Sequence, residues 1–313
     1  MKRIICICGP TASGKTGLAV ALAKKLDAEV VSCDSMQIYR GMDVGTAKPD
    51  AAEMDGVPHH LLDVAEPGEE FSVSRYVELA DAAMEDIHSR GKVAIVCGGT
   101  GLYMDSLIQG QGFAPPPDHG ERAYLEQAAE KKGMQFLYDM LKDADPETAE
   151  KLHVSDRKRI IRALEVFLIT GLPLSYHNAQ SKLKGPKHEA DWIGLTFRDR
   201  AKLYARVDAR VEQMMANGLA DEVRSLLARG VDPKTTAMQA IGYKELAAAL
   251  RGEGSIEQAV AEIQQATRRY AKRQLTWFRR NEAIRWLYVD ETPDLLSAAL
   301  RLLDCSFPAF NCI

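Results

Sequence analysis

The 313-residue sequence lacks the features that mark several protein classes. No apolar run approaches the roughly 18 residues of a transmembrane helix, and Met1-Lys2-Arg3-Ile4 leads directly into a short strand-like segment instead of a signal peptide. We therefore expect a cytoplasmic protein without a membrane partner. The six cysteines and the histidines show no zinc-ligand spacing, and four of the cysteines fall in apolar runs. We expect those cysteines to be small buried side chains.

An excess of positive charge is also missing, because the net charge is −4. Such a balance would argue against a nucleic-acid partner, but the charges are unevenly distributed. The segment from Arg268 to Arg280 contains six Lys and Arg residues and no acid, and a second basic cluster runs from Arg157 to Arg162. Tyr270 and Trp277 lie within the first segment, and aromatic rings stack on unpaired bases. This pattern favours RNA binding, although a solvated helix face remains the simpler alternative.

The order of apolar segments predicts an α/β fold. Short apolar runs alternate with segments of helical period, which indicates a parallel sheet flanked by helices. The pattern changes at Pro115-Pro116-Pro117, where a linker is expected, and resumes at Trp192–Phe197. Between them we expect helices and a polar, irregular stretch from His177 to His188. The prediction is a P-loop NTPase-like core, residues 1–114 and 191–313, with a mostly helical insertion domain, residues 115–190.

The strongest motif lies between the first expected strand, Ile4–Cys8, and the first expected helix. It matches the pattern G-x-x-x-x-G-K-[ST], in which backbone N–H groups at a helix N-terminus surround a phosphate. Lysine in this motif reaches the terminal phosphates, and the final hydroxyl is a ligand of Mg²⁺. The predicted diphosphate-binding residues are Gly9, Pro10, Thr11, Ala12, Ser13, Gly14, Lys15 and Thr16, with Thr16 as the metal ligand.

The sequence lacks the N-K-x-D motif of switch GTPases. The strand Val93–Cys97 ends in glycines and Thr100, where a motor ATPase or a typical kinase would have an acid that holds Mg²⁺. The acid occurs instead at Asp34, after the second expected strand. Because the carboxyl ends of parallel strands meet at one edge of a sheet, Asp34, Thr100 and the P-loop should converge. Asp34 could be a metal ligand there, or a general base.

At this point the sequence resembles the tRNA dimethylallyltransferase (IPP transferase) family, bacterial type. The matching segments cover nearly the whole chain in order. Where that family usually has Asn-Asp before the basic helix of the insertion, this chain has Ser155-Asp156. The segments are GPTASGKT at 9–16, DSMQIYR at 34–40, GGTGLY at 98–103, RALEVF at 162–167, QAIGYKE at 239–245 and RRYAKRQLTWFR at 268–279.

The resemblance implies a transfer of the dimethylallyl group of dimethylallyl diphosphate to N6 of adenosine 37, next to the anticodon of a tRNA. In that reaction Asp34 would accept the N6 proton, while Lys15, Mg²⁺ and the loop stabilise the departing diphosphate. Thr100 is the third expected catalytic residue, and Arg206, ahead of Arg210, is the expected arginine partner of the leaving group. We expect Mg²⁺ as the cofactor and a monomeric enzyme that binds a tRNA anticodon stem-loop.

The resemblance also assigns the tRNA contacts. They comprise the segment after the second strand, the basic part of the insertion and the basic helix near the C-terminus. The expected residues are Asp34, Ser35, Met36, Gln37, Thr100, Arg122, Lys158, Arg159, Ile160, Ile161, Arg162, Arg268, Arg269, Lys272 and Arg273.

Three alternatives remain open from the residues alone. A small-molecule P-loop kinase would use the Arg157–Arg162 cluster as a lid over ATP, and an adenylate isopentenyltransferase would prenylate a free nucleotide. A non-catalytic RNA-binding NTPase is the third. The pair His59-His60 could hold a proton or a metal, but we interpret it as structural because no acid cluster lies nearby in the sequence.

Overall fold

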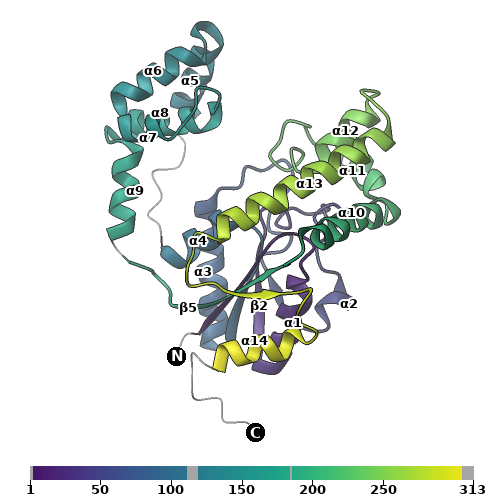
Figure 1. Ribbon diagram of the computed structural model, residues 1–313. Coiled ribbons are helices and arrows are strands. Elements are labelled where there is room, and N and C mark those ends of the chain that lie inside the picture. Colours follow the sequence, from purple (N-terminus) through teal and green to yellow (C-terminus); the bar gives the residue numbers. More distant parts are fainter. Residues whose placement is uncertain (1–2, 111–118, 184, 305–313) are drawn as a thin grey trace. The chain divides into compact units, whose positions relative to one another are not determined.

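The computed structural model describes residues 3–110, 119–183 and 185–304 (Figure 1). The chain divides into two compact units, one formed by Met1–Leu107 with Glu189–Ile313 and the other by Ile108–His188. The sequence pattern predicts boundaries after residues 114 and 190, whereas the units divide the chain after residues 107 and 188. The expected proline linker lies outside the described residues.

A six-stranded parallel sheet forms the first unit. The strand order is β3-β2-β4-β1-β5-β6, so β4 and β1 are central and both have partners on each side. Because all strands are parallel, their carboxyl ends lie along one edge. The strands are β1 (Ile4–Cys8), β2 (Ala28–Cys33), β3 (His59–His60), β4 (Val93–Gly98), β5 (Ala190–Thr196) and β6 (Arg285–Tyr288).

Helices cover the sheet because its central strands are apolar on both faces. All five residues of β1 are buried. Ile5 and Ile7 pack against α1 (Lys15–Leu26) and α14 (Leu295–Asp304), whereas α3 (Val73–Ser89) packs on β2 and β4. Tyr76 of α3 donates a hydrogen bond to the Ser32 carbonyl in this layer. The strand ends are left open to ligands by this arrangement.

Four further helices of the first unit pack on one another beyond the sheet (Figure 1). Helix α13 contacts both α10 and α12, and α11 contacts α10 and α12. Their shared core includes Tyr39 and Met42, which belong to the segment that follows β2. The loop after β2 is therefore anchored by this helical layer. The helices are α10 (Arg200–Ala216), α11 (Leu219–Ala228), α12 (Tyr243–Leu250) and α13 (Ile256–Phe278).

The second unit is helical and has its own apolar core. That core includes Leu125, Leu137, Leu141, Ile160 and Leu164, all nearly inaccessible to solvent. Its independence from the sheet agrees with the helical character that the sequence predicts for this region. The helices are α5 (His119–Lys132), α6 (Met134–Ala144), α7 (Pro146–Glu150), α8 (Arg157–Thr170) and α9 (Leu174–Leu183).

Several elements differ from the sequence-based expectation. The stretch from His177 to His188 was expected to be irregular, which holds for residues 185–188, but α9 continues from Leu174 to Leu183. The expectation is wrong for the helical residues because Leu174 packs on the core of the second unit and the Ser175 N–H donates to the carboxylate of Asp145 at 2.9 Å. Five further elements were not predicted from the sequence: α2 (Ala51–Met54), the two-residue strand β3, α4 (Gly101–Gln109), α7 and α14.

Among the described residues, no helix combines the length and the hydropathy needed to cross a bilayer.

Candidate active site

The loop between β1 and α1 has the backbone of an anion cradle. Gly9 and Gly14 have φ angles of +144° and +87°, which residues with a Cβ rarely adopt. A Cβ on Gly9 would lie 2.4 Å from the Leu195 carbonyl oxygen, so β5 closes against the loop there. Gly14 is the N-cap of α1, and no side chain caps that helix. The first N–H groups of α1 are consequently available to a phosphate.

Lys15 folds back over this cradle. Its Nζ donates a hydrogen bond to the Pro10 carbonyl at 2.6 Å. Burial lowers its pKa from 10.5 to about 8, and the charge of Arg210 adds to this effect, whereas the charge of Asp34 opposes it. An ammonium that is poorly solvated and next to another cation gains more from an anion than an exposed lysine does.

Helix α10 brings two arginines to the same place. The Nε of Arg206 donates to the Ala12 carbonyl in the loop at 2.9 Å, and its guanidinium lies 5.6 Å from the ring centroid of Phe197. Arg210 is half-buried, and burial lowers its pKa, while the charge of Asp34 acts in the opposite direction. Both candidate arginines therefore adjoin the P-loop, and Arg206 contacts it directly.

Asp34 and Thr100 follow the neighbouring strands β2 and β4. Asp34 Oδ1 accepts a hydrogen bond from the Met36 N–H at 2.9 Å, which fixes the carboxylate in a tight turn. The Thr100 hydroxyl accepts from the Ser35 N–H at 3.0 Å. The charge of Asp34 influences the pKa values of both Lys15 and Arg210. The carboxylate, the lysine and the arginine thus share one region at the carboxyl edge of the sheet.

Gln274 was not singled out from the sequence, although it lies within the C-terminal family motif. Its Oε1 accepts from the Thr11 N–H at 2.9 Å, and its Nε2 donates to the Gly99 carbonyl at 3.0 Å. Gln274 is buried, and a Cβ on Gly99 would lie 2.1 Å from its Nε2. This side chain joins the P-loop to the segment that follows β4. The only signal in the sequence was the polar residue within an amphipathic helix.

Trp277 and Tyr270 of the same helix contact the segment around Thr100. Trp277 Nε1 donates to the carboxylate of Asp105 at 2.7 Å, and its ring occupies the space next to Gly101. Burial raises the pKa of Tyr270, and the charge of Asp34 adds to this, while a side-chain hydrogen bond with Thr100 lowers it. Both rings therefore pack against the protein segment around Thr100.

The expected tRNA contacts after β2 have different environments. Gln37 accepts from the Ser32 hydroxyl at 3.0 Å and donates to the Thr46 and Ala47 carbonyls at 3.3 and 3.0 Å. Its side-chain amide therefore holds the loop together. Ser35 and Met36 are half-buried, and Met36 packs on the helical layer beyond the sheet.

The expected tRNA contacts of the second unit differ in solvent exposure. Lys158 and Arg159 are exposed on α8. The expectation that Ile160 and Ile161 contact tRNA is wrong for their side chains. These side chains are 0% and 2% exposed and lie in the core of the unit. The helical period of α8 turns these two residues inward, while the preceding two face solvent.

Arg122 and Arg162 share one carboxylate partner. Both pair with Glu165, which is fully buried: Arg122 Nε lies 2.9 Å and Arg162 Nη1 lies 2.7 Å from its oxygens. Both arginines keep part of their surface in contact with solvent. Glu165 therefore fixes their positions on the unit.

On α13 the four expected basic contacts also differ. Arg268 forms an ion pair with Asp208 of α10, and Arg273 lies 5.6 Å from the ring centroid of Tyr270. Arg269 and Lys272 are exposed. The ion pair neutralises the charge of Arg268 within the protein. The charges of Arg269 and Lys272 are therefore more accessible to a binding partner than that of Arg268.

The Thr16 hydroxyl fits the expected magnesium ligand. It has no hydrogen bond within the described residues, and it lines a small hollow next to Cys97 and Gln37. No group of three or more His, Cys, Asp or Glu side chains suited to a metal occurs in residues 3–110, 119–183 and 185–304. Mg²⁺ commonly takes few protein ligands and completes its shell with phosphate oxygens and water. One hydroxyl next to a diphosphate cradle is compatible with that preference.

The histidine pair has structural partners. His60 Nε2 lies 2.8 Å from Glu29, which also pairs with Arg90. His59 Nδ1 lies 2.9 Å from the Val57 carbonyl, and burial lowers its pKa. The pair therefore joins β3 to its surroundings, and His59 also lines the small hollow next to Thr16.

Comparisons with known proteins agree on one family. A family model described as IPP transferase matches residues 37–281. A protein named tRNA dimethylallyltransferase from Thermoanaerobacter sp. is 48% identical over 291 residues, 92% of each chain. The protein of the same name from Acetivibrio thermocellus is 49% identical over 292 residues, 93% of each chain.

Solved structures give the same result. The tRNA isopentenylpyrophosphate transferase of Bacillus halodurans is 40% identical with a TM-score of 0.72, and the match covers 98% of this chain and 96% of that one. A eukaryotic dimethylallyltransferase, solved acting on tRNA, is 28% identical with a TM-score of 0.84, covering 98% of this chain and 79% of that one.

Proposed function

The chain belongs to the IPP transferase family, and we propose that it transfers a dimethylallyl group from dimethylallyl diphosphate to N6 of adenosine 37 in tRNA. The observation that carries this proposal is the arrangement at the carboxyl ends of neighbouring strands. Asp34 follows β2 and precedes Ser35, whose N–H donates to the Thr100 hydroxyl after β4, and Gln274 joins the segment after β4 to Thr11 of the P-loop. A proton acceptor next to an anion cradle is what alkylation by an allylic diphosphate requires.

The reaction replaces one bond by another. The N6 nitrogen forms a bond to C1 of the allyl group while the bond between C1 and the diphosphate oxygen breaks. The N6 lone pair is delocalised into the purine ring, so the amine is a weak nucleophile. Asp34 would take the N6 proton as positive charge develops on nitrogen. The proton thus stays on the carboxylate until solvent removes it.

The leaving diphosphate gains negative charge, and three groups of the protein would stabilise it. They are the N–H groups at the start of α1, the ammonium of Lys15 and the guanidinium of Arg206, which already contacts the Ala12 carbonyl. Lys15 would exchange its hydrogen bond with Pro10 for one with a phosphate oxygen. Thr100 would keep Asp34 in place through its bond to the next residue, Ser35.

Thr16 would hold Mg²⁺ together with the diphosphate oxygens. When bound, the ion neutralises charge on the leaving group. The protein groups around it bind and orient the diphosphate.

The tRNA would present adenosine 37 from its anticodon loop, where an unpaired base can be extruded at modest cost. The exposed cations of α8, Lys158 and Arg159, and the arginines held by Glu165 would bind backbone phosphates. A single chain carries all the groups named here, which supports action as a monomer. Such an enzyme would work in the cytoplasm, where it meets tRNA.

A transfer assay with radiolabelled dimethylallyl diphosphate tests the proposal. The acceptors are an anticodon stem-loop with A36-A37-A38, the same stem-loop with guanosine at position 37, and free AMP. Label should enter the first RNA and neither of the others. Label in AMP alone would indicate an adenylate isopentenyltransferase. Consumption of added ATP without label transfer would indicate a kinase or a non-catalytic NTPase, and either result would contradict the proposal.

A further inference from the structure

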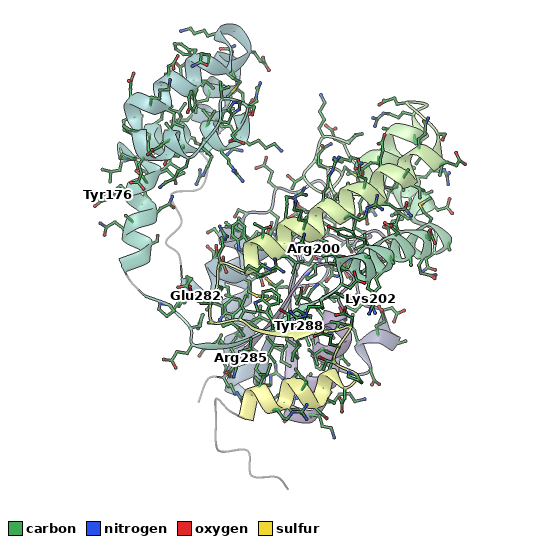
Figure 2. The ribbon with its side chains drawn as sticks, in the orientation of Figure 1. Tyr176, Arg200, Lys202, Glu282, Arg285 and Tyr288 are labelled. Carbon is green, nitrogen blue, oxygen red and sulfur yellow. The ribbon has the colours of Figure 1, made fainter. Side chains whose placement is uncertain are left out.

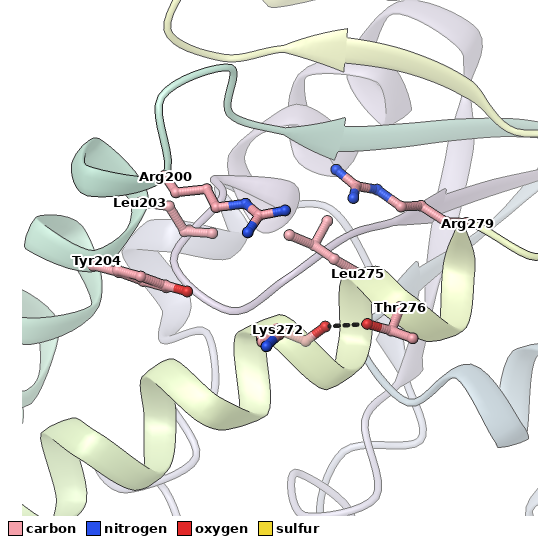
Figure 3. Close-up of a pocket in the computed structure, with 7 residues that line it drawn as sticks. All are labelled: Arg200, Leu203, Tyr204, Lys272, Leu275, Thr276 and Arg279. Atoms are coloured by element: carbon pink, nitrogen blue, oxygen red, sulfur yellow. Dashed lines mark hydrogen bonds between the residues drawn. The ribbon is translucent and has the colours of Figure 1, made fainter.

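A shallow pocket lies between α10 and α13 (Figure 3). Of its lining residues, Lys272 alone is among the expected tRNA contacts. Its volume is about 50 Å³. This is far below the roughly 300 Å³ of a typical small-molecule site, so it admits one small group and not a nucleoside. The lining residues are Arg200, Leu203, Tyr204, Lys272, Leu275, Thr276 and Arg279.

Three of these side chains are cations without a partner. Arg200, Lys272 and Arg279 form no ion pair and no side-chain hydrogen bond with any residue that the structure describes. Figure 3 shows the guanidinium groups of Arg200 and Arg279 extending toward each other above Leu275. Like charges held close together repel, and an anion between them would relieve that repulsion.

Several other cations of these two helices, and Arg280 just after α13, have partners. Arg206 donates to the Ala12 carbonyl, and Arg268 pairs with Asp208. Arg273 lies 5.6 Å from the Tyr270 ring centroid, and Arg280 lies 4.0 Å from that of Trp277. Arg269 of α13 likewise has no partner among the described residues, so the distinguishing feature of the pocket is that three such cations line one hollow.

The pocket is separate from the P-loop cradle but close to it. Leu203 and Leu275 line the pocket and also belong to the buried cluster that contains Ala12 of the P-loop. One layer of apolar side chains thus lies between the pocket and the loop. A low-polarity floor also strengthens the attraction between the cations above it and an anion.

The Tyr204 hydroxyl is a further donor, since Tyr204 is half-buried at the pocket. The Thr276 hydroxyl donates its hydrogen to the Lys272 carbonyl at 3.0 Å and does not add to the set. Two guanidiniums, an ammonium and a phenol match a group with several oxygens and negative charge. No carboxylate lines the pocket to compete for these donors.

We propose that this pocket is a second phosphate-binding site, which holds one phosphate group outside the P-loop. Two ligands of the proposed reaction carry such a phosphate group, and naming them rests on the proposed function. One is a backbone phosphate of the tRNA, and the other is the free diphosphate, as substrate headgroup or released product. The pocket would add a fixed contact to RNA binding in the first case and a capture or exit position in the second.

Direct binding measurements distinguish the sources without any transfer assay. The first arm titrates inorganic diphosphate into a Lys15→Met variant, in which the P-loop has lost its ammonium. Binding should persist there and weaken about tenfold or more when Arg200→Gln and Arg279→Gln are added, if the diphosphate is the ligand. Lys202→Gln is the matched control, since Lys202 lies on α10 two positions from Arg200 and does not line the pocket (Figure 2).

The second arm measures the affinity of the anticodon stem-loop over a range of salt concentrations. If a backbone phosphate is the ligand, the double arginine variant should weaken RNA binding about tenfold and reduce the salt slope by about 1, whereas Lys202→Gln should not. A loss in either arm, or in both, supports the site and identifies its source. Unchanged affinities in both arms, with normal thermal unfolding, would overturn the proposal. A failed transfer assay would contradict the proposed function without altering these binding results.

Discussion

Gln274 lies 263 positions after Thr11 in the chain, and yet its side-chain oxygen accepts a hydrogen bond from the Thr11 N–H at 2.9 Å. The amide nitrogen of the same side chain donates to the Gly99 carbonyl. One buried side chain therefore fixes the distance between the P-loop and the segment that carries Thr100. We expect the placement of a bound diphosphate relative to Asp34 to depend on this link.

Removing that link should destabilise the protein and weaken substrate binding. In Gln274→Ala, the Thr11 N–H and the Gly99 carbonyl lose their partner in a buried position, which should cost about 2–3 kcal/mol of unfolding free energy. The KM for dimethylallyl diphosphate should rise as well. Urea denaturation and initial rates check both effects. Gln265→Ala, an exposed position of the same helix, should change neither, and an unaltered KM in Gln274→Ala would contradict the proposed link.

Asp34→Asn should abolish proton acceptance while the anion cradle stays intact. We expect a fall in kcat of about 10²–10⁴-fold, the usual contribution of a general base, with diphosphate binding largely retained. Calorimetric titration with diphosphate and single-turnover rates measure the two quantities. Asp55→Asn is a suitable control, because Asp55 is an exposed partner of Lys24. If Asp34→Asn lost diphosphate binding instead, the carboxylate would act mainly through the metal.

Diphosphate binding should depend on pH through Lys15. Burial lowers its pKa to about 8 in the folded protein, so the ammonium is present below that pH and is lost as the pH rises through it. The KM for dimethylallyl diphosphate should therefore increase about tenfold per pH unit from about 8 upward. Because the charge of Arg210 also lowers this pKa, Arg210→Gln should move the increase to higher pH. A KM that stayed constant up to pH 10 would exclude this role of Lys15.

The same shift has the opposite consequence for stability. The folded state binds the Lys15 proton less tightly than the unfolded state, so this residue should add stability as the pH rises from about 8 toward 10.5. Thermal unfolding of the wild-type protein and of Lys15→Met over that range isolates the contribution. Lys25→Met, at an exposed position of α1, should follow the wild-type profile.

Gly101→Ala should displace Trp277. A Cβ at this position would lie 2.1 Å from Cδ1 of the indole ring, and the ring would have to leave Asp105. Overpacking of this kind costs about 1–3 kcal/mol, and the tryptophan fluorescence should change with it. Gly120→Ala is the matched control, since no atom lies within 4 Å of the added Cβ. Equal stability of the two variants would show that the indole tolerates the methyl group.

Removal of divalent metal should stop transfer. With EDTA the rate should fall about 100-fold or more, since charge on the leaving diphosphate would lose one of its counter-ions, and added Mg²⁺ should restore it. Thr16→Val keeps the shape of the side chain and removes the hydroxyl, so it should raise the Mg²⁺ concentration needed for half-maximal rate. Thr267→Val, which removes a hydroxyl that donates to the Ile263 carbonyl within α13, should leave that concentration unchanged.

Much of the architecture followed from local pattern. The P-loop was recognisable because its glycines, lysine and threonine stand at fixed spacing between an apolar run and a helical period. The sheet class and most helices followed from periodicity, which reflects which side of each element is buried. Elements with weak or short patterns were missed or misjudged, such as β3 with its two residues and α9 with its polar sequence.

The sequence by itself determined that the chain has an anion cradle, an acid after the second strand and a helical insertion. Each of these features depends on residues that are adjacent in the sequence. Only the tertiary structure decided which side chains meet. It buried Ile160 and Ile161, paired Arg122 and Arg162 with Glu165, and gave Gln274 two partners from distant segments. The physical reason is that such contacts depend on how elements pack in space, and residues close in space here are far apart in the chain.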